Sequence, residues 1–367
     1  MTTGFFWDER CFWHGGGNYA FTLPLGGLVQ PLAAGGLPES PETKRRLKNL
    51  MDVTGLTREL SVHSAPQATR EDLLRVHPES YLDAFKRMSD TGGGELGLRT
   101  PFAQGGYEHA ALSAGLAKAA VQQVWTGALT NAYALSRPPG HHCLPDFPNG
   151  FCLMANIAIA IEAAKADHGL GRVAVLDWDV HHGNGTEAIY YARDDVLTIS
   201  IHQDGNYPID TGAVTDRGTG PGTGYNMNIP LPAGAGDATY ADVMEQIVRP
   251  ALERFRPDMI IVACGFDASA VDPLARMSLT ANGFAMLTRQ IKETADALCD
   301  GKLVLVHEGG YSEVYVPFCG HATIATLAGS TITAPDPLEK NLTARQPNGR
   351  FAEFLKREVA DLARALE

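Results

Sequence analysis

The segment Asp177-Trp178-Asp179-Val180-His181-His182 places two carboxylates and an imidazole at alternate positions, directly after the apolar run Arg172–Leu176. Successive side chains of a strand point to opposite faces, so Asp177, Asp179 and His181 would share one face if the extended backbone continued. Crowded carboxylates repel each other unless a cation lies among them. Oxygen and imidazole donors together suit a divalent transition metal such as Zn²⁺. The pattern therefore predicts a metal site rather than a solvated loop.

Asp179, His181 and Asp267 are the expected metal ligands. Asp267 follows a second apolar run, Asp258–Gly265, where a helix N-cap or a loop residue is the alternative interpretation. Three protein ligands leave one coordination position for water, which is the pattern of catalytic rather than structural zinc sites. Water bound there ionises near neutral pH. The three residues thus predict hydrolytic chemistry.

A pair of histidines, His141-His142, follows two prolines and a glycine, which stiffen the approach and permit an unusual turn. Adjacent histidines also occur by chance. Beside a metal-bound water, one of the two becomes a natural general base. A carboxylate or an amide behind each ring would fix its tautomer, and Asp177 and Asn184 are the available partners.

Tyr311 follows Gly309-Gly310, which we interpret as a flexible hinge into the site. A phenol there could donate a hydrogen bond to a developing oxyanion, although a core tyrosine is the alternative. Asp177 need not bind the zinc. With nearby backbone carbonyls and the hydroxyl of Ser200, it could hold a second, monovalent cation that offsets the crowding of carboxylates.

Short apolar runs alternate with longer helical patterns along the chain. Continuous apolar runs such as Met259–Ala263 indicate strands buried on both faces, hence a parallel sheet between helical layers. The rhythm predicts one doubly wound α/β domain over residues 1–367. The expected strands are Asn131–Ser136, Arg172–Trp178, Val196–His202, Asp258–Gly265 and Lys302–His307, and the expected helices are Glu108–Thr126, Asn156–His168, Ala238–Phe255, Ala281–Leu298 and Phe351–Leu366.

The polar clusters follow four of these strands, and ligands of open α/β sheets gather at the carboxyl ends of strands. The clusters begin at Arg137, Asp177, Phe266 and Glu308. We therefore expect all four on one rim of the sheet. Ser40, followed by Pro41, predicts a helix start with proline at the first helical position.

The bulk composition excludes several functions. The 367 residues carry a net charge of −12, so no general affinity for nucleic acid or an anionic membrane is expected. No apolar run is long enough to span a bilayer, and no signal peptide is evident. The six cysteines form no C-x-x-C pair, which indicates a reduced, cytoplasmic protein. The long loop Gly15–Gly36 and the C-terminal helix could make contacts in a homo-oligomer.

These motifs resemble those of the zinc-dependent histone deacetylase family, including the acetylpolyamine amidohydrolases. The resemblance runs from about Ser40 to Ser330. Asn184 and Glu308 favour the class II branch and its bacterial amidohydrolase relatives over class I. Five motifs carry it in order: Arg137-Pro138-Pro139-Gly140-His141-His142, Gly150-Phe151-Cys152, Asp177-Trp178-Asp179-Val180-His181-His182-Gly183-Asn184-Gly185, Gly265-Phe266-Asp267 and Glu308-Gly309-Gly310-Tyr311.

The resemblance implies an arginase/deacetylase fold, with a parallel eight-stranded sheet flanked by helices. It implies one catalytic zinc ion and two structural potassium ions. It also implies hydrolysis of acetyl or other acyl amides on lysine side chains or similar amines through a metal-activated water. The residues that it assigns are Asp179, His181 and Asp267 for zinc, His142 as general base and acid, His141 paired with Asp177, Tyr311 for the amide carbonyl, Asp177 and Ser200 for one potassium, Tyr190, Val196 and Tyr225 for the other, and Gly150, Phe151, Tyr207 and Leu274 for the channel.

Two channel positions depart from the family pattern. Tyr207 stands where most relatives carry phenylalanine, and its hydroxyl could narrow the channel or bind an acyl group. Leu274 stands where polyamine-selective relatives carry glutamate, and an apolar side chain cannot pair with a remote ammonium. Glu95 could supply an acidic rim that holds substrate backbone. Leu274 therefore favours acyl-lysine or another apolar-flanked amide over acetylpolyamine.

Three rival functions remain open. An acetylpolyamine amidohydrolase would share the same metal site. A ureohydrolase of the arginase type would share the fold but need two manganese ions and further metal-facing carboxylates and histidines. A non-catalytic acyl-recognition module would be expected to lack a zinc ligand or Tyr311, and this chain has both.

Overall fold

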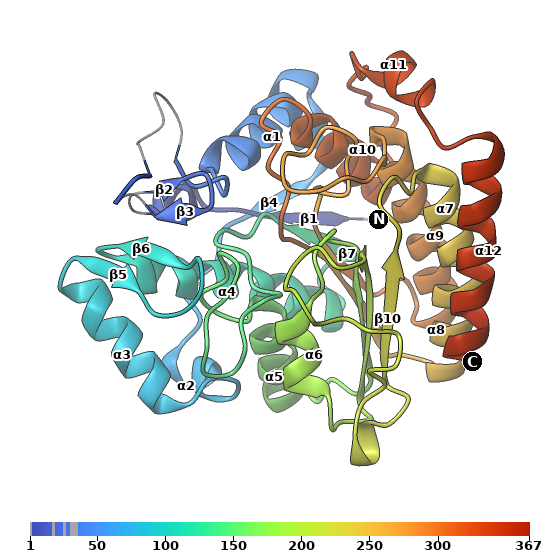
Figure 1. The fold of residues 1–367 in the computed structure, drawn as a ribbon. Helices are drawn as coiled ribbons and strands as arrows, with labels where there is room; N and C mark the ends of the chain where they lie inside the picture. The colour runs from blue at the N-terminus through green and yellow to red at the C-terminus, as the bar shows by residue number, and fades with distance from the viewer. Residues whose placement is uncertain (1, 17–18, 25–26, 30–35) are drawn as a thin grey trace.

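A parallel sheet forms the centre of the molecule (Figure 1). The computed structural model describes residues 2–16, 19–24, 27–29 and 36–367, and in this part of the chain eight strands pair in the order β10-β9-β8-β11-β12-β7-β1-β4. All neighbouring strands of this sheet run parallel. The strands are β1 (Thr3–Phe6), β4 (Ser61–His63), β7 (Asn131–Ala134), β8 (Val173–Asp177), β9 (Val196–Gln203), β10 (Asn226–Leu231), β11 (Met259–Cys264) and β12 (Leu303–His307).

The five strands expected from apolar runs all form, and they are the five contiguous strands β9-β8-β11-β12-β7 of the sheet. The sequence pattern misses β1, β4 and β10. β1 and β4 have only four and three residues. β10 alternates buried Asn226 and Asn228 with apolar residues and contains Pro230, which a strand at the sheet edge tolerates because one side needs no ladder donor. Short or polar strands therefore carry no continuous apolar signal.

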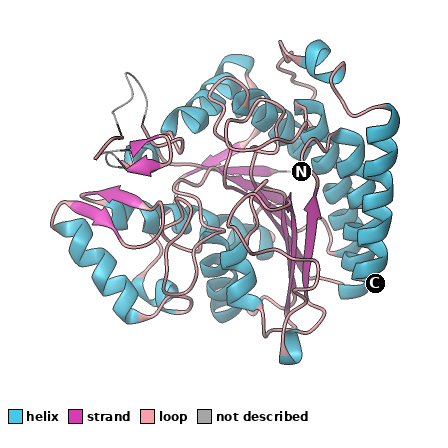
Figure 2. Ribbon diagram, in the orientation of Figure 1, coloured by secondary structure: helices cyan, strands magenta, loops and turns pink. Residues whose placement is uncertain are grey.

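Helices cover both faces of the sheet (Figure 2). In Figure 1, α4, α5 and α6 lie on one side, and α1, α9 and α10 lie on the other. The apolar faces of both layers pack on the sheet, whose central strands β8, β11 and β12 are buried along their length. The helices are α1 (Pro41–Thr54), α2 (Arg70–Leu74), α3 (Glu79–Asp90), α4 (Gly106–Trp125), α5 (Asn156–His168), α6 (Asn184–Tyr190), α7 (Asp237–Val243), α8 (Arg249–Phe255), α9 (Ala281–Leu298), α10 (Val316–Ala328), α11 (Glu339–Thr343) and α12 (Gly349–Leu366).

The helix expected over Ala238–Phe255 is interrupted. A π-helical turn, Met244–Val248, separates α7 from α8. Pro250 has no backbone N–H and its ring crowds the preceding turn, which accounts for the wider turn directly before it. The predicted start of α1 is correct: Ser40 Oγ accepts a hydrogen bond from Glu42 N at 3.1 Å, and Pro41 is the first helical residue.

The segment Gly15–Gly36, expected to be an irregular loop, contains the short antiparallel pair β2 (Tyr19–Ala20) and β3 (Leu23–Pro24). Residues 17–18, 25–26 and 30–35 of this segment lie outside the described residues. A second antiparallel pair, β5 (Gly93–Glu95) and β6 (Pro101–Ala103), lies outside the main sheet. All six cysteines are buried and free. In the described residues, every helix is too short or too polar to cross a bilayer.

A buried ion network ties α1 to the segment after β7. Glu39 lies between Arg137 and Lys44, and all three side chains are at most 2% exposed. Arg137 Nε donates to Glu39 Oε1 at 3.0 Å, and Lys44 Nζ lies 3.0 Å from the same oxygen. Burial would raise the pKa of Glu39, but the two cations lower it to about 2. The network holds the backbone that leads into His141.

We predict that Glu39→Ala lowers the free energy of unfolding by about 3–5 kcal/mol, because it leaves two buried cations without a counter-charge. Denaturant unfolding measures the difference. Lys292→Ala, which removes a surface ion pair with Asp296, is the control and should cost less than about 1 kcal/mol. Equal losses in the two variants would contradict this view of the network.

Candidate active site

The polar clusters that follow β7, β8, β11 and β12 meet at one edge of the sheet. These four strands are neighbours in the order β8-β11-β12-β7, and because they are parallel, all their carboxyl ends lie on the same edge. This arrangement follows the expected position of sites in open α/β sheets. The expectation of a single rim is therefore correct.

Asp179, His181 and Asp267 converge at the bottom of this edge. One potential ligand atom from each lies within 4.8 Å of the others. His181 Nδ1 is 3.1 Å from Asp179 Oδ1 and 3.1 Å from Asp267 Oδ2. Neither carboxylate side chain is exposed at all. The three residues could hold one metal ion.

A turn, and not an extended strand, positions these ligands. β8 ends at Asp177, so the extended backbone does not continue through His181. Backbone amides fix the carboxylates instead: Val180 N donates to Asp267 Oδ1 at 2.7 Å, and Gly309 N donates to Asp179 Oδ2 at 2.8 Å. A turn held by these hydrogen bonds brings the ligands together.

The charges of this cluster demand a cation. Burial would lower the pKa of His181, but Asp267 and Asp179 raise it to about 10. Burial and the neighbouring Asp179 raise the pKa of Asp267 to about 6. Two buried carboxylates thus share one imidazole nitrogen, and a metal ion in place of its proton would neutralise more of their charge.

His141 and His142 lie side by side, with ring centroids 4.0 Å apart, and each has the partner expected from the sequence. His141 Nδ1 lies 2.9 Å from Asp177 Oδ2. His142 Nδ1 lies 2.8 Å from Asn184 Oδ1, and because a carbonyl oxygen only accepts, Nδ1 carries the proton and Nε2 is the free acceptor.

The two rings differ in charge because their surroundings differ. Burial opposes a charge on His141, but Asp179 and Asp177 raise its pKa well above the ordinary value. Burial, together with the neighbouring His141 and His181, lowers the pKa of His142 well below the ordinary value. His142 is therefore the neutral ring, which can accept a proton, beside a positively charged His141.

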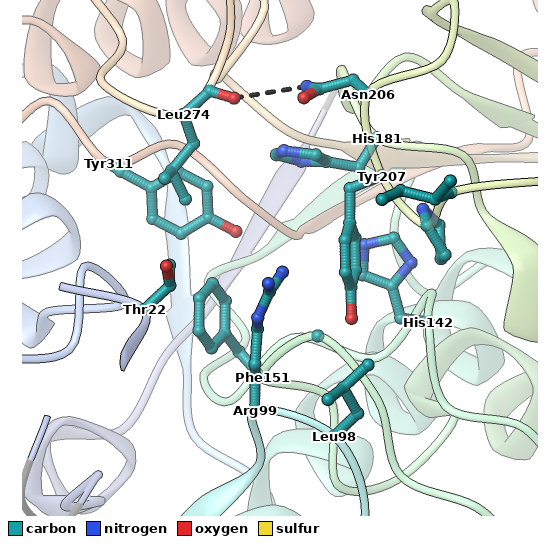
Figure 3. Close-up of a pocket in the computed structure, with 13 residues that line it drawn as sticks. Thr22, Leu98, Arg99, His142, Phe151, His181, Asn206, Tyr207, Leu274 and Tyr311 are labelled. Atoms are coloured by element: carbon teal, nitrogen blue, oxygen red, sulfur yellow. Dashed lines mark hydrogen bonds between the residues drawn. The ribbon is translucent and has the colours of Figure 1, made fainter. Parts of the chain in front are cut away.

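Tyr311 reaches the same site from the loop after β12. Figure 3 shows its hydroxyl pointing into the pocket, across from His142 and His181. Burial and the charges of Asp267 and Asp179 raise the pKa of the phenol well above its ordinary value, so it remains a hydrogen-bond donor. Tyr311 N donates to Asp272 Oδ2 at 2.8 Å, which fixes the loop.

The expected hinge at Gly309-Gly310 is instead a close-packed turn. A Cβ on Gly309 would collide with the carboxylates of Asp267 and Asp179. Gly310 has φ +121°, a conformation that other residues rarely adopt. The glycines let Tyr311 approach the carboxylates closely, so packing and not flexibility accounts for them.

A cavity of about 410 Å³ leads from the surface to these residues. The four expected channel residues, Gly150, Phe151, Tyr207 and Leu274, all line it. His142 and His181 form its buried end, whereas Leu98 and Ile209 at the lining are 50% and 73% exposed and mark its mouth. Sequence reasoning missed Leu98, Ile209 and the other lining residues Thr22, Arg99, Asn206 and Pro208.

Tyr207, Leu274 and Glu95 each take part in a hydrogen bond within the protein. The hydroxyl of Tyr207 donates to Asn149 Oδ1, so it is not free to bind an acyl group as expected. Burial raises the pKa of this phenol to about 12. Asn206 Nδ2 donates to the carbonyl oxygen of Leu274 at 3.2 Å (Figure 3). Glu95 accepts hydrogen bonds from Tyr19 Oη and Thr100 N, which makes it a loop anchor.

Asp177 and Ser200, where one potassium ion was expected, are register partners on the neighbouring strands β8 and β9. They line a small cavity of about 10 Å³, the size of a single water or ion. Asp177 Oδ1 accepts from Asp179 N at 3.0 Å, so this carboxylate braces the metal-ligand turn. At the second expected position, Tyr225 O accepts from Thr198 N and Tyr190 Oη donates to Glu162.

Two acids that sequence reasoning did not assign support the site. Glu308 Oε2 accepts from Gly140 N at 2.6 Å and His141 N at 3.1 Å, so it fixes the turn of the paired histidines. Asp272 holds Tyr311, and burial together with Asp267 raises its pKa to about 8. The sequence places Glu308 inside a motif and Asp272 beside Leu274, but it does not reveal their roles, because backbone amides as hydrogen-bond partners leave no pattern of residue types.

Comparison with known proteins agrees with this geometry. Residues 37–327 match the model of the histone deacetylase domain. The chain is 58% identical over 361 residues to a histone deacetylase-like amidohydrolase of Pseudomonas aeruginosa, covering 98% of this chain and 95% of that protein. It is 38% identical to a probable deacetylase of Archaeoglobus fulgidus, covering 89% and 92%. The crystal structure of the HDA15 HD domain superposes with a TM-score of 0.81 at 31% identity, covering 100% of this chain and 99% of that one. The fold is thus the arginase/deacetylase fold, and the chain belongs to the histone deacetylase family.

Proposed function

We propose that the chain is a zinc-dependent amidohydrolase that removes acetyl or other acyl groups from lysine side chains or similar amines. One observation carries the proposal: His142, Tyr311 and His181, which belongs to the buried metal-ligand cluster, all line one cavity. Membership in the family and the deacetylase and amidohydrolase names of its relatives support it.

Asp179, His181 and Asp267 would hold the zinc. Their donor set fits this metal, since it offers two carboxylates and one imidazole, and three protein ligands are typical of catalytic zinc. When bound, zinc polarises a carbonyl and makes water acidic. We further propose structural potassium at Asp177 and Ser200 and at the second position near Tyr190.

The protein's own groups would then move the protons and position the substrate. His142 Nε2 takes a proton from the attacking water and later delivers it to the leaving amine, because Asn184 keeps the other nitrogen protonated. His141, held by Asp177, provides positive charge beside it. Tyr311 Oη donates a hydrogen bond to the amide oxygen as negative charge develops there. The products are a carboxylate and a free amine.

The channel walls favour an apolar stem. Phe151, Tyr207 and Leu274 surround the path to the metal-ligand cluster and can pack against the methylenes of an acylated lysine. Leu274 offers no charge to the remote ammonium of a polyamine. An acetylpolyamine amidohydrolase is therefore only the second candidate function. A two-manganese ureohydrolase has little support, because the other metal-like group in the described residues, His141, Cys152 and Glu308, includes a thiol. A non-catalytic acyl-recognition module would not need His142 and Tyr311.

We predict that Asp179→Asn lowers the stoichiometry of bound zinc from about one to near zero after dialysis against a weak chelator. The reason is the loss of one anionic ligand from a site of three. Elemental analysis gives the metal content, and a melting curve confirms that the variant is folded. Asp361→Asn on α12, which is exposed, should keep its zinc. Full zinc in Asp179→Asn would contradict the ligand assignment.

Tyr311→Phe should lower kcat by about 10²-fold or more, the scale for loss of one oxyanion donor. Zinc content should stay unchanged because the phenol is not among the ligands. Steady-state kinetics on an acetyl-lysine peptide measures the effect, with Tyr191→Phe as the control. Near-normal turnover in Tyr311→Phe would remove the phenol from the reaction.

We expect a higher kcat/KM for acetyl-lysine peptides than for acetylputrescine. Leu274→Glu should narrow the difference by about tenfold, since a carboxylate at this wall would attract the free ammonium of the polyamine. Initial rates on both substrates with both proteins test this. A wild-type preference for acetylputrescine would favour the polyamine alternative.

A further inference from the structure

We propose that Arg99 is a specificity-determining residue that binds a carboxylate on the amine side of the acylated substrate. This inference rests on the proposed amide hydrolysis, which it deepens by naming the substrate class. The preferred substrates are acylated amines that carry an anionic group close to the mouth of the channel.

The charge of the cavity lining points to an anion. Arg99 is the one arginine or lysine among the thirteen described lining residues, and none of these residues is an aspartate or a glutamate. The chain as a whole carries a net charge of −12, so the single arginine of this cavity has the opposite sign to the net charge of the protein. Such a local field would attract an anionic group to the mouth.

The position of Arg99 is fixed by the channel wall itself. Its carbonyl oxygen accepts from Phe151 N at 2.9 Å, and the carbonyl oxygen of Leu98 accepts from Gly150 N at 3.0 Å. Its guanidinium carbon lies 5.1 Å from the centre of the Tyr207 ring. Figure 3 shows the side chain extending into the pocket between Phe151 and Tyr207. Phe151 therefore holds the backbone of Arg99, and Tyr207 packs against its guanidinium; both are expected channel residues.

The backbone of Arg99 indicates a constraint beyond folding. Its φ is +58°, in the left-handed region that favours glycine or asparagine. A conformation of this kind costs free energy and is often found where a side chain must point into a ligand site. The same turn would form more easily with glycine, so the arginine side chain itself is the feature to explain.

In the part of the chain that the structure describes, the guanidinium has no acidic partner. Among the described residues, no carboxylate oxygen lies within 4.0 Å of it, and none of the residues outside the described part is acidic. Glu95, four residues earlier, is engaged by Tyr19 Oη at 2.7 Å and by Thr100 N at 2.9 Å. Without an ion-pair partner among the described residues, the guanidinium of Arg99 can bind a carboxylate with two parallel hydrogen bonds.

The direction of the channel decides which part of the substrate meets Arg99. The acyl group lies at the buried end, beside His142 and Tyr311, so the amine and whatever it carries point to the mouth. For an acylated lysine, the anionic group that lies at the mouth is either its own α-carboxylate or an acidic side chain next to it in a peptide. An acetylpolyamine would present an ammonium to the guanidinium and be repelled.

The experiment compares three peptides on the zinc-loaded full chain: one ending in acetyl-lysine with a free carboxylate, the same peptide as its amide, and the amide extended by aspartate. We expect kcat/KM for one or both anionic peptides to exceed that for the neutral amide by about tenfold or more, mainly through KM, because the contact is remote from the reacting bond. The two anionic arms distinguish the α-carboxylate from a side chain.

Arg99→Gln should lower the ratio of kcat/KM for the anionic peptides to kcat/KM for the neutral amide from about tenfold to near one, and Arg99→Lys should restore part of it. Arg357→Gln on α12, an exposed residue, makes the same change in net charge and should leave the preference intact. Equal rates on all three peptides in the wild type, or a preference that survives Arg99→Gln, would overturn the role of Arg99 and leave the proposed function standing. No turnover of any peptide would overturn the proposed function, and the role of Arg99 with it.

Discussion

The site depends on the placement of several buried acids around too few positive charges. Asp177, Asp179, Asp267 and Glu308 are each at most 3% exposed, and His141 and His181 are the basic groups between them. In a low-dielectric interior, such a group of acids is stable only with protons, backbone donors or a cation among them. Backbone amides donate hydrogen bonds to the outer carboxylate oxygens. The remaining inward-facing oxygen and nitrogen atoms are ligands that suit a metal.

The sheet makes this crowding possible. Four adjacent parallel strands, β8, β11, β12 and β7, end at the same edge, so four separate segments deliver their polar residues to one place. The strands are anchored by the buried core and by the Arg137, Glu39 and Lys44 network behind the histidine turn. Rigid support of this kind holds Asp179, Asp267 and Tyr311 close together despite the repulsion between the acids.

Much of the fold was predictable because the central strands are continuous apolar runs that alternate with amphipathic helices. The strands β1, β4 and β10 were not, since short or polar strands depend on tertiary pairing. The motif residues could be predicted to gather at one rim, and the structure brings them together. The anchoring roles of Asp272 and Glu308 could not, because their partners are backbone amides. Arg99 was also missed, since an isolated arginine in a loop has no signature until the fold places it beside Tyr207.

The central claim is that one metal ion lies among Asp179, His181 and Asp267. Anomalous diffraction at the zinc edge, from crystals of the wild-type protein prepared with zinc, tests this most directly. We expect a single strong peak among these three side chains, with zinc to oxygen and nitrogen distances of about 2.0–2.2 Å. A site without a peak, a peak beside Cys152 and Glu308 instead, or Asp267 turned away from the ion would contradict it.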